Sequence, residues 1–190
     1  MGDFRDYLKS SAAVLSEMER GADVAHVEKA ADVIFEALAA DKPLLICGNG
    51  GSASDAMHIA GELVGRFLKD RRALKAIALT ADSAILTAWG NDFGYEDVFA
   101  RQVHAYGEKG GVLLAISTSG RSKNVIAAVE VAKSKGMATI AMTGKGGGHL
   151  AAMVDVLLAA PSSETPLIQQ AHVCIYHYLC AEVEARIAQR

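Results

Sequence analysis

The run Pro43-Leu44-Leu45-Ile46-Cys47 and the glycine-rich residues Gly48-Asn49-Gly50-Gly51-Ser52 that follow it decide the fold of this chain. An unbroken apolar run of this length is expected for a strand whose sheet is covered by helices on both faces. The glycines permit a tight turn, and residues 53–67 then place apolar side chains at helical spacing. This order predicts one strand–turn–helix unit of a parallel α/β protein.

The rest of the chain repeats this alternation. Further strand-length apolar runs lie at residues 76–79, 112–116, 138–142 and 156–159. Helical spacing is found at residues 83–89, 96–106, 122–135, 150–153 and 166–188, and in two segments of residues 4–40 that are interrupted near Gly21-Ala22-Asp23. The pattern predicts an α/β three-layer sandwich, flavodoxin-like, with a five-stranded parallel sheet and right-handed crossovers. We expect residues 1–190 to form a single domain, in which the N-terminal helices of residues 1–40 pack on the sheet or on neighbouring subunits.

The composition of the chain argues against several classes of function. The chain has 190 residues, of which 51% are hydrophobic, and this suffices for one substantial core. A net charge of -3 gives no general attraction to nucleic acid or anionic membranes. The sequence shows no basic-then-apolar leader, and no apolar run approaches the roughly 20 residues of a membrane span. Three widely spaced cysteines in apolar surroundings predict small buried side chains and a reducing cytoplasm.

Two loops are candidates for ligand binding. In parallel sheets, ligands lie beyond the carboxyl ends of the strands, where loops lead into helix N-termini. One such loop is Gly48–Ser54, and the other is Ser117-Thr118-Ser119-Gly120-Arg121-Ser122. Glycines, hydroxyl groups and free helix N–H groups together can hold a phosphate without a lysine. The alternative is that these residues only form turns and caps. Because the first loop lacks the Rossmann and Walker spacings, a nucleotide site is not expected.

His58 and Glu62 lie one helical turn apart directly after the first loop. A carboxylate and an imidazole on one helix face can transfer protons, although many such pairs are only solvated ion pairs. Gln169 and His177 add polar groups to the last helix, where they are separated by roughly 80° around the axis. His172, in contrast, lies among apolar residues and is expected to be a core histidine.

Several motifs together resemble one known family. They are Cys47–Ser52, Asp55-Ala56-Met57-His58 with Glu62, Gly90–Gly94, Ile116–Ser122, Met142–Lys145, and Ile168-Gln169 followed by His177. In this combination, and through nearly the whole chain, the sequence resembles the sedoheptulose 7-phosphate isomerases (phosphoheptose isomerases) of the sugar isomerase (SIS) superfamily.

The resemblance implies an enzyme that interconverts sedoheptulose 7-phosphate and D-glycero-D-manno-heptose 7-phosphate for surface glycans such as lipopolysaccharide. It implies a homotetramer with sites between subunits, so that Glu62 and His177 could meet across an interface. It assigns the phosphate to Ser117, Thr118, Ser119 and Ser122, and the sugar to Asn49, Gly50, Gly51, Ser52, Asn91, Asp92 and Gln169. Zinc is implied as cofactor, with the matching positions His58, Glu62, Gln169 and His177. Arg66 matches an arginine near the family's site, but is equally well explained as a surface or interface residue.

The chemistry of ketose–aldose isomerisation fits these residues. A proton leaves the carbon beside the carbonyl and returns to the former carbonyl carbon through a cis-enediol, which requires a base and a group that stabilises the oxyanion. We expect Glu62 to act as the base and His177 as the partner acid, and these roles could be exchanged. If Glu62 ligates zinc, it is less available as the base. A second hypothesis is a regulatory SIS-domain protein of the DnaA initiator-associating type. Such proteins generally lack the glutamate and the C-terminal histidine, both of which this chain has.

Overall fold

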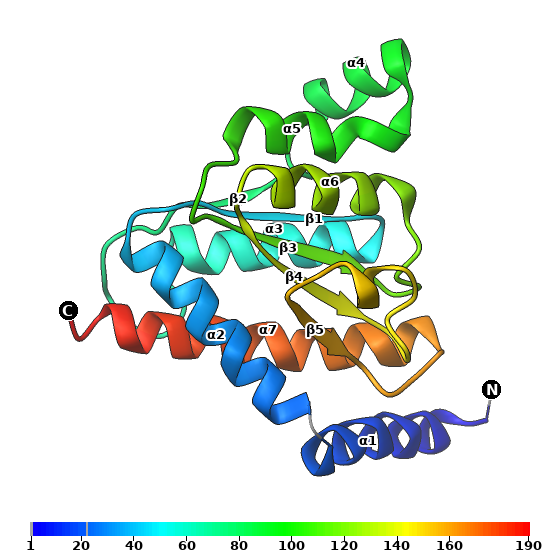
Figure 1. Ribbon diagram of the computed structural model, residues 1–190. Coiled ribbons are helices and arrows are strands. Elements are labelled where there is room, and N and C mark those ends of the chain that lie inside the picture. Colours follow the sequence, from blue (N-terminus) through cyan, green and yellow to red (C-terminus); the bar gives the residue numbers. More distant parts are fainter. Residues whose placement is uncertain (1, 22) are drawn as a thin grey trace.

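The computed structural model describes residues 2–21 and 23–190. Its centre is a five-stranded parallel sheet in the order β2-β1-β3-β4-β5 (Figure 1). The strands are β1 (Leu44–Gly48), β2 (Ala76–Ala78), β3 (Val112–Ser117), β4 (Ala138–Thr143) and β5 (Val156–Ala159). In the register, Leu44 pairs with Ala76 on one side and with Val112 on the other. The predicted parallel sheet is therefore confirmed, and each predicted strand is present.

Helices cover both faces of the sheet. One face packs against α2 (Asp23–Ala39), α3 (Gly51–Val64) and α7 (Thr165–Ile187), and the other packs against α5 (Val98–Tyr106) and α6 (Lys123–Ser134). Successive side chains of a strand point to opposite faces, so Ile46 lies in the first core while Leu45 lies in the second. This two-sided burial explains why the strands are unbroken apolar runs rather than alternating ones.

Four predicted helices, at residues 53–67, 83–89, 96–106 and 150–153, differ from those in the structure. Helix α3 ends at Val64 rather than at residue 67, because the backbone N–H of Phe67 donates to the carboxylate of Glu184 instead of continuing the helix. Residues 150–153 form only the 3-10 turn η2 (Leu150–Ala152). Helix α4 (Ser83–Phe93) extends beyond residue 89 and stops before Gly94, whose φ of 99° an ordinary helix cannot include. The turn η1 (Tyr95–Asp97) then leads into α5.

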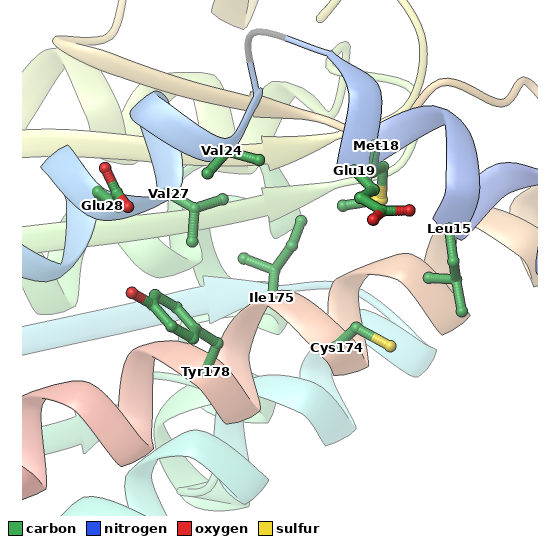
Figure 2. A pocket seen from close by; sticks show the side chains of 9 residues that line it. All are labelled: Leu15, Met18, Glu19, Val24, Val27, Glu28, Cys174, Ile175 and Tyr178. Atoms are coloured by element: carbon green, nitrogen blue, oxygen red, sulfur yellow. The ribbon is translucent and has the colours of Figure 1, made fainter.

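Helix α1 (Phe4–Arg20) begins at the cap residue Asp3 and lies along α7 (Figure 1). Val14 is its one buried residue, and Phe4 remains 74% exposed. An apolar cleft of about 370 Å³ lies between α1, α2 and α7 (Figure 2), and its lining includes Met18, Val27 and Ile175. The predicted interruption near residues 21–23 includes Ala22, which is outside the described residues.

The cysteines follow the prediction in two cases. Cys47 and Cys180 are buried, but Cys174 is exposed, because it lies on the side of α7 that borders the apolar cleft. Burial raises the pKa of the Cys47 and Cys180 thiols to about 12. None of the helices in the described part of the chain has the length and apolar character that crossing a bilayer requires.

Candidate active site

The two predicted loops meet where the strand order reverses. Chain order runs from β1 outward to β2 and then back to β3 on the other side, so the loops after β1 and β3 flank the crevice in which α/β proteins bind ligands. The side-chain amides of Asn49 and Asn124 exchange two hydrogen bonds of 2.9 Å across this crevice. The hydroxyl of Tyr95 donates to the Asn49 Oδ1 at 3.1 Å. These contacts fix the two loops relative to each other.

The loop after β3 has its hydroxyl groups turned towards one another. The Oγ atoms of Ser117 and Ser122 lie 2.9 Å apart, and Ser119 Oγ accepts the backbone N–H of Arg121. Ser122 occupies the cap position of α6 without making a side-chain cap bond. The N-terminus of α6 and these hydroxyls therefore form a pocket of donors suited to a phosphate. Thr118 is half-buried within the same loop.

The loop after β1 presents bare backbone. Gly50 has a φ of 57°, and no atom lies near the position that its Cβ would occupy, so a ligand can approach it closely. A Cβ on Gly51 would overlap the amide nitrogen of Gln169. Gln169, from the second turn of α7, therefore lies directly against the start of α3. Ser52 is buried in the first turn of α3.

Helices α3 and α7 run side by side in the same direction. Gln169 lies beside Gly51, and seven residues further along both helices, the Tyr176 hydroxyl lies 3.1 Å from Nδ1 of His58. The Nε2 of His58 lies 3.1 Å from Oε1 of Glu62, and the side chains of these two residues are 45% and 23% exposed. The cluster is thus accessible from solvent and rigidly attached to two core helices.

His177 completes this cluster within a single chain. Its ring lies edge-on to the His58 ring, with centroids 5.2 Å apart, and is stacked on Phe67. The structure therefore brings together His58, Glu62 and His177, while Gln169 lies two helical turns away. Within the described residues, no group of three or more histidine, cysteine, aspartate or glutamate side chains is already arranged around a metal position.

The partners behind His58 were not found from the sequence. Burial raises the pKa of Tyr176 to about 12, and the nearby Asp55 carboxylate adds to the shift. Burial also raises the pKa of Asp55, whose Oδ2 is buried without a hydrogen-bond partner. A neutral His58 carries one ring proton. On Nε2 this proton is donated to Glu62 while Nδ1 accepts from the Tyr176 hydroxyl; on Nδ1 it is donated to the Tyr176 oxygen and Nε2 is left as a base or ligand. The spacing of Asp55, three residues before His58 on α3, was the available signal.

Other predicted residues lie apart from this cluster. Asn91 and Asp92 are exposed on α4 and are joined to each other by a hydrogen bond of 2.9 Å. In the described part of the chain, neither forms a hydrogen bond to any of the remaining predicted site residues. Arg66 is exposed. His172 is fully buried and lies 3.0 Å from the carbonyl oxygen of Thr143, which confirms its assignment to the core.

Comparison with known proteins decides the family. Residues 6–144 match the family model of the SIS domain. The chain is 52% identical to the phosphoheptose isomerase of Nitratiruptor over 84% of its own length and 85% of that protein. The chain belongs to the phosphoheptose isomerase family. This is an enzyme family, and the names of these relatives indicate an isomerase rather than a regulatory protein.

Solved structures of phosphoheptose isomerases agree with this assignment. The enzyme of Neisseria gonorrhoeae superimposes with a TM-score of 0.90 at 42% identity, over 95% of this chain and 96% of that one. The enzyme of Francisella tularensis gives 0.91 at 38% identity with the same coverage. The phosphoheptose isomerase fold thus extends over almost the whole chain, including the N-terminal helices.

Proposed function

We propose that this protein converts sedoheptulose 7-phosphate to D-glycero-D-manno-heptose 7-phosphate. The observation that carries the proposal is the cluster of His58, Glu62 and His177 on α3 and α7. A binding protein needs the hydroxyl-rich loop but not an acid–base cluster. Membership of the phosphoheptose isomerase family supports the same substrate.

The phosphate would bind between Ser117, Thr118, Ser119 and Ser122 at the N-terminus of α6. The positive end of the helix dipole and its free N–H groups favour the dianion there. Asn49, the open backbone at Gly50 and Gly51, Ser52 and Gln169 would bind the sugar hydroxyls, with Asn91 and Asp92 approaching from α4. This arrangement fixes the carbon chain before any proton moves.

Glu62 would remove the proton beside the carbonyl and return it to the neighbouring carbon. His177 would donate a proton to the carbonyl oxygen and accept a proton from the neighbouring hydroxyl group. The cis-enediol would then form without an uncompensated negative charge on oxygen. His58 holds the Glu62 carboxylate at 3.1 Å and limits its rotamers. Substituting Glu62 and His177 in turn distinguishes this assignment from the one in which their roles are exchanged.

Zinc is proposed as the cofactor, with His58, Glu62, Gln169 and His177 as ligands. Gln169 lies two helical turns from the other three in the same chain, so this ligand would have to come from a neighbouring subunit. The residues fit in chemistry, since imidazole nitrogens and a carboxylate are usual zinc ligands, and the 3.1 Å between His58 Nε2 and Glu62 Oε1 suits two ligands of one ion at about 2.0–2.2 Å. Tyr176 supplies the outer contact that orients a ligating histidine. When bound, zinc would act as a Lewis acid on the substrate oxygens.

We propose a homotetramer whose sites are completed between subunits. Gly51 and Glu62 are eleven residues apart on α3, which is about 16 Å along the axis. Six carbon–carbon bonds of about 1.5 Å cannot extend a heptose chain beyond about 9 Å. This difference supports a site in which the loops after β1 and β3 of one subunit face the acid–base cluster of another. The exposed apolar residues of α1 offer surface for such contacts.

The biological setting follows from the same proposal. We place the reaction in the cytoplasm, in the synthesis of heptose for surface glycans such as lipopolysaccharide. The free thiols of Cys47, Cys174 and Cys180 are compatible with a reducing compartment.

The deciding experiment is an NMR assay of the purified protein with sedoheptulose 7-phosphate, before and after chelation and zinc repletion. Heptose 7-phosphate formation that falls on chelation and returns with zinc supports both activity and cofactor. Fructose 6-phosphate serves as the competing substrate, and a preference for it would overturn the substrate assignment. Absence of turnover in every state would favour the regulatory hypothesis. Light scattering tests the assembly, and a monomer would contradict the shared site.

A further inference from the structure

A buried ion pair lies behind the acid–base cluster. The Arg71 Nη2 is 3.3 Å from Oε1 of Glu184, and the two side chains are only 2% and 1% exposed. Neither residue was singled out from the sequence. Removing two charges from water is costly, so a buried pair of this kind contributes little net stability by itself. Its contacts suggest what else it does.

Glu184 holds the segment that follows α3. Its carboxylate accepts three backbone N–H groups, from Phe67 at 2.8 Å, Leu68 at 2.6 Å and Lys69 at 2.8 Å. Although burial raises the pKa of Glu184, these bonds and the Arg71 charge outweigh it and lower the pKa overall. The carboxylate therefore stays ionised, and it fixes residues 67–69 against the last turns of α7.

Arg71 holds the end of α3 itself. Its guanidinium donates to the backbone carbonyl oxygens of Glu62 and Gly65, each at 2.7 Å. The last carbonyls of a helix have no partner within the helix, so Arg71 takes the place of the missing turn. One of the two residues it fixes is Glu62, the proposed base.

The fixed segment also reaches the proposed acid. The ring of Phe67 is stacked on His177, with centroids 5.5 Å apart and an interplanar angle of 27°. The backbone of Phe67 is held by Glu184, and the backbone of Glu62 is held by Arg71. The ion pair is thus linked to Glu62 directly through its backbone and to His177 through the Phe67 ring.

We propose that Arg71 and Glu184 are positioning residues for the isomerisation, which hold Glu62 and the Phe67–His177 stack at their working separation. This inference rests on the proposed function. Misplacement of reacting groups by about 1 Å can cost about 10²-fold in rate. Loss of the pair should therefore lower kcat, while KM, which depends on the loops after β1 and β3, should change little.

The test compares three variants with the wild-type protein. Glu184→Gln should lower kcat at least tenfold with KM changed less than twofold, and should accelerate hydrogen exchange at the amides of residues 67–69. Arg186→Met is the matched control. It removes an α7 arginine whose ion pair, 2.7 Å to Asp32, does not involve residues 67–69. It should leave kcat and the exchange rates unchanged.

The double variant Arg71→Met/Glu184→Met separates positioning from stability. Replacing both charges by apolar side chains leaves no unpaired charge buried, but it also removes the hydrogen bonds to the backbone of residues 62, 65 and 67–69. We therefore expect kcat to stay low even where thermal stability rises above that of the single variant. Recovery of kcat together with stability would overturn the proposal. If the wild-type protein shows no turnover, the proposed function fails separately. The positioning role is then decided by exchange at Phe67 and by the His177 ring signals in NMR, and unchanged values in Glu184→Gln would refute it.

Discussion

Asn49 and Asn124 exchange two hydrogen bonds of 2.9 Å between the loop after β1 and the start of α6. The two residues are 75 positions apart in the chain, and their contact crosses the point where the strand order reverses. An amide pair of this type uses one donor and one acceptor of each side chain. It therefore sets the spacing between the sugar side and the phosphate side of the proposed site.

Substitution of Asn124 should widen this spacing. Asn124→Ala removes both bonds and leaves Nδ2 of Asn49 without its partner, while the Tyr95 hydroxyl still donates to Oδ1. The loss is expected to cost about 1–3 kcal/mol of stability. KM for the sugar phosphate should rise about tenfold, which corresponds to about 1.4 kcal/mol of binding energy. Steady-state kinetics and urea unfolding measure the two effects. Ser134→Ala, at the exposed end of the same helix, is the control, and an unchanged KM in Asn124→Ala would refute the bridging role.

Gly51 should tolerate no side chain without loss of activity. In Gly51→Ala the new methyl group would displace the Gln169 amide, which is the flexible end of its side chain, so the fold should persist while turnover falls. Gly61→Ala, in the same helix with no atom near the new methyl, should instead raise stability by about 0.5–1 kcal/mol. If Gln169→Ala and Gly51→Ala act through one contact, their effects on kcat/KM will not add. Full additivity would show independent causes.

Glu62→Gln should abolish catalysis with the fold intact. The amide keeps the size of the side chain and a hydrogen bond to His58, but it cannot accept the substrate proton. Loss of a general base costs about 10²–10⁴ in rate. Exchange of the substrate proton with deuterated water, followed by NMR, should disappear together with turnover. Glu130→Gln, on the exposed face of α6, is the control, and near-normal turnover in Glu62→Gln would exclude it as the base.

Much of the sheet could be predicted because burial leaves a local signal. The strands Leu44–Gly48 and Val112–Ser117 are buried at every position, and their side chains before the terminal Gly48 and Ser117 are all apolar. Helices on both faces of the sheet explain this pattern. The glycines and serines after these strands likewise predicted the two loops. The pairing order and register needed the structure, since the order of strands is not written in any single segment.

The residues behind the site could not be predicted for a different reason. Glu184 and Arg71 lie in different elements, and charged residues near helix ends are normally solvated. Their burial results from the way in which the segment after α3 folds over α7. Tyr176 was missed because it lies among the core residues of α7, and its contact with His58 depends on the parallel packing of two helices. Sequence spacing within one helix cannot reveal contacts of this kind.

His172 should make the stability of the protein depend on pH. Burial lowers the pKa of its imidazole, although the carbonyl oxygen of Thr143 favours the protonated form. Below about pH 6.5 the unfolded chain binds a proton at this position and the folded chain does not. The free energy of unfolding therefore falls as the pH decreases towards the folded-state pKa. The slope is at most about 1.4 kcal/mol per pH unit. In His172→Gln, whose amide can still donate to Thr143, this part of the slope should vanish. Urea unfolding at pH 7.5 and 5.5 measures it, with His104→Gln as the exposed control. An equal slope in His172→Gln and the wild-type protein would assign the acid sensitivity to other groups.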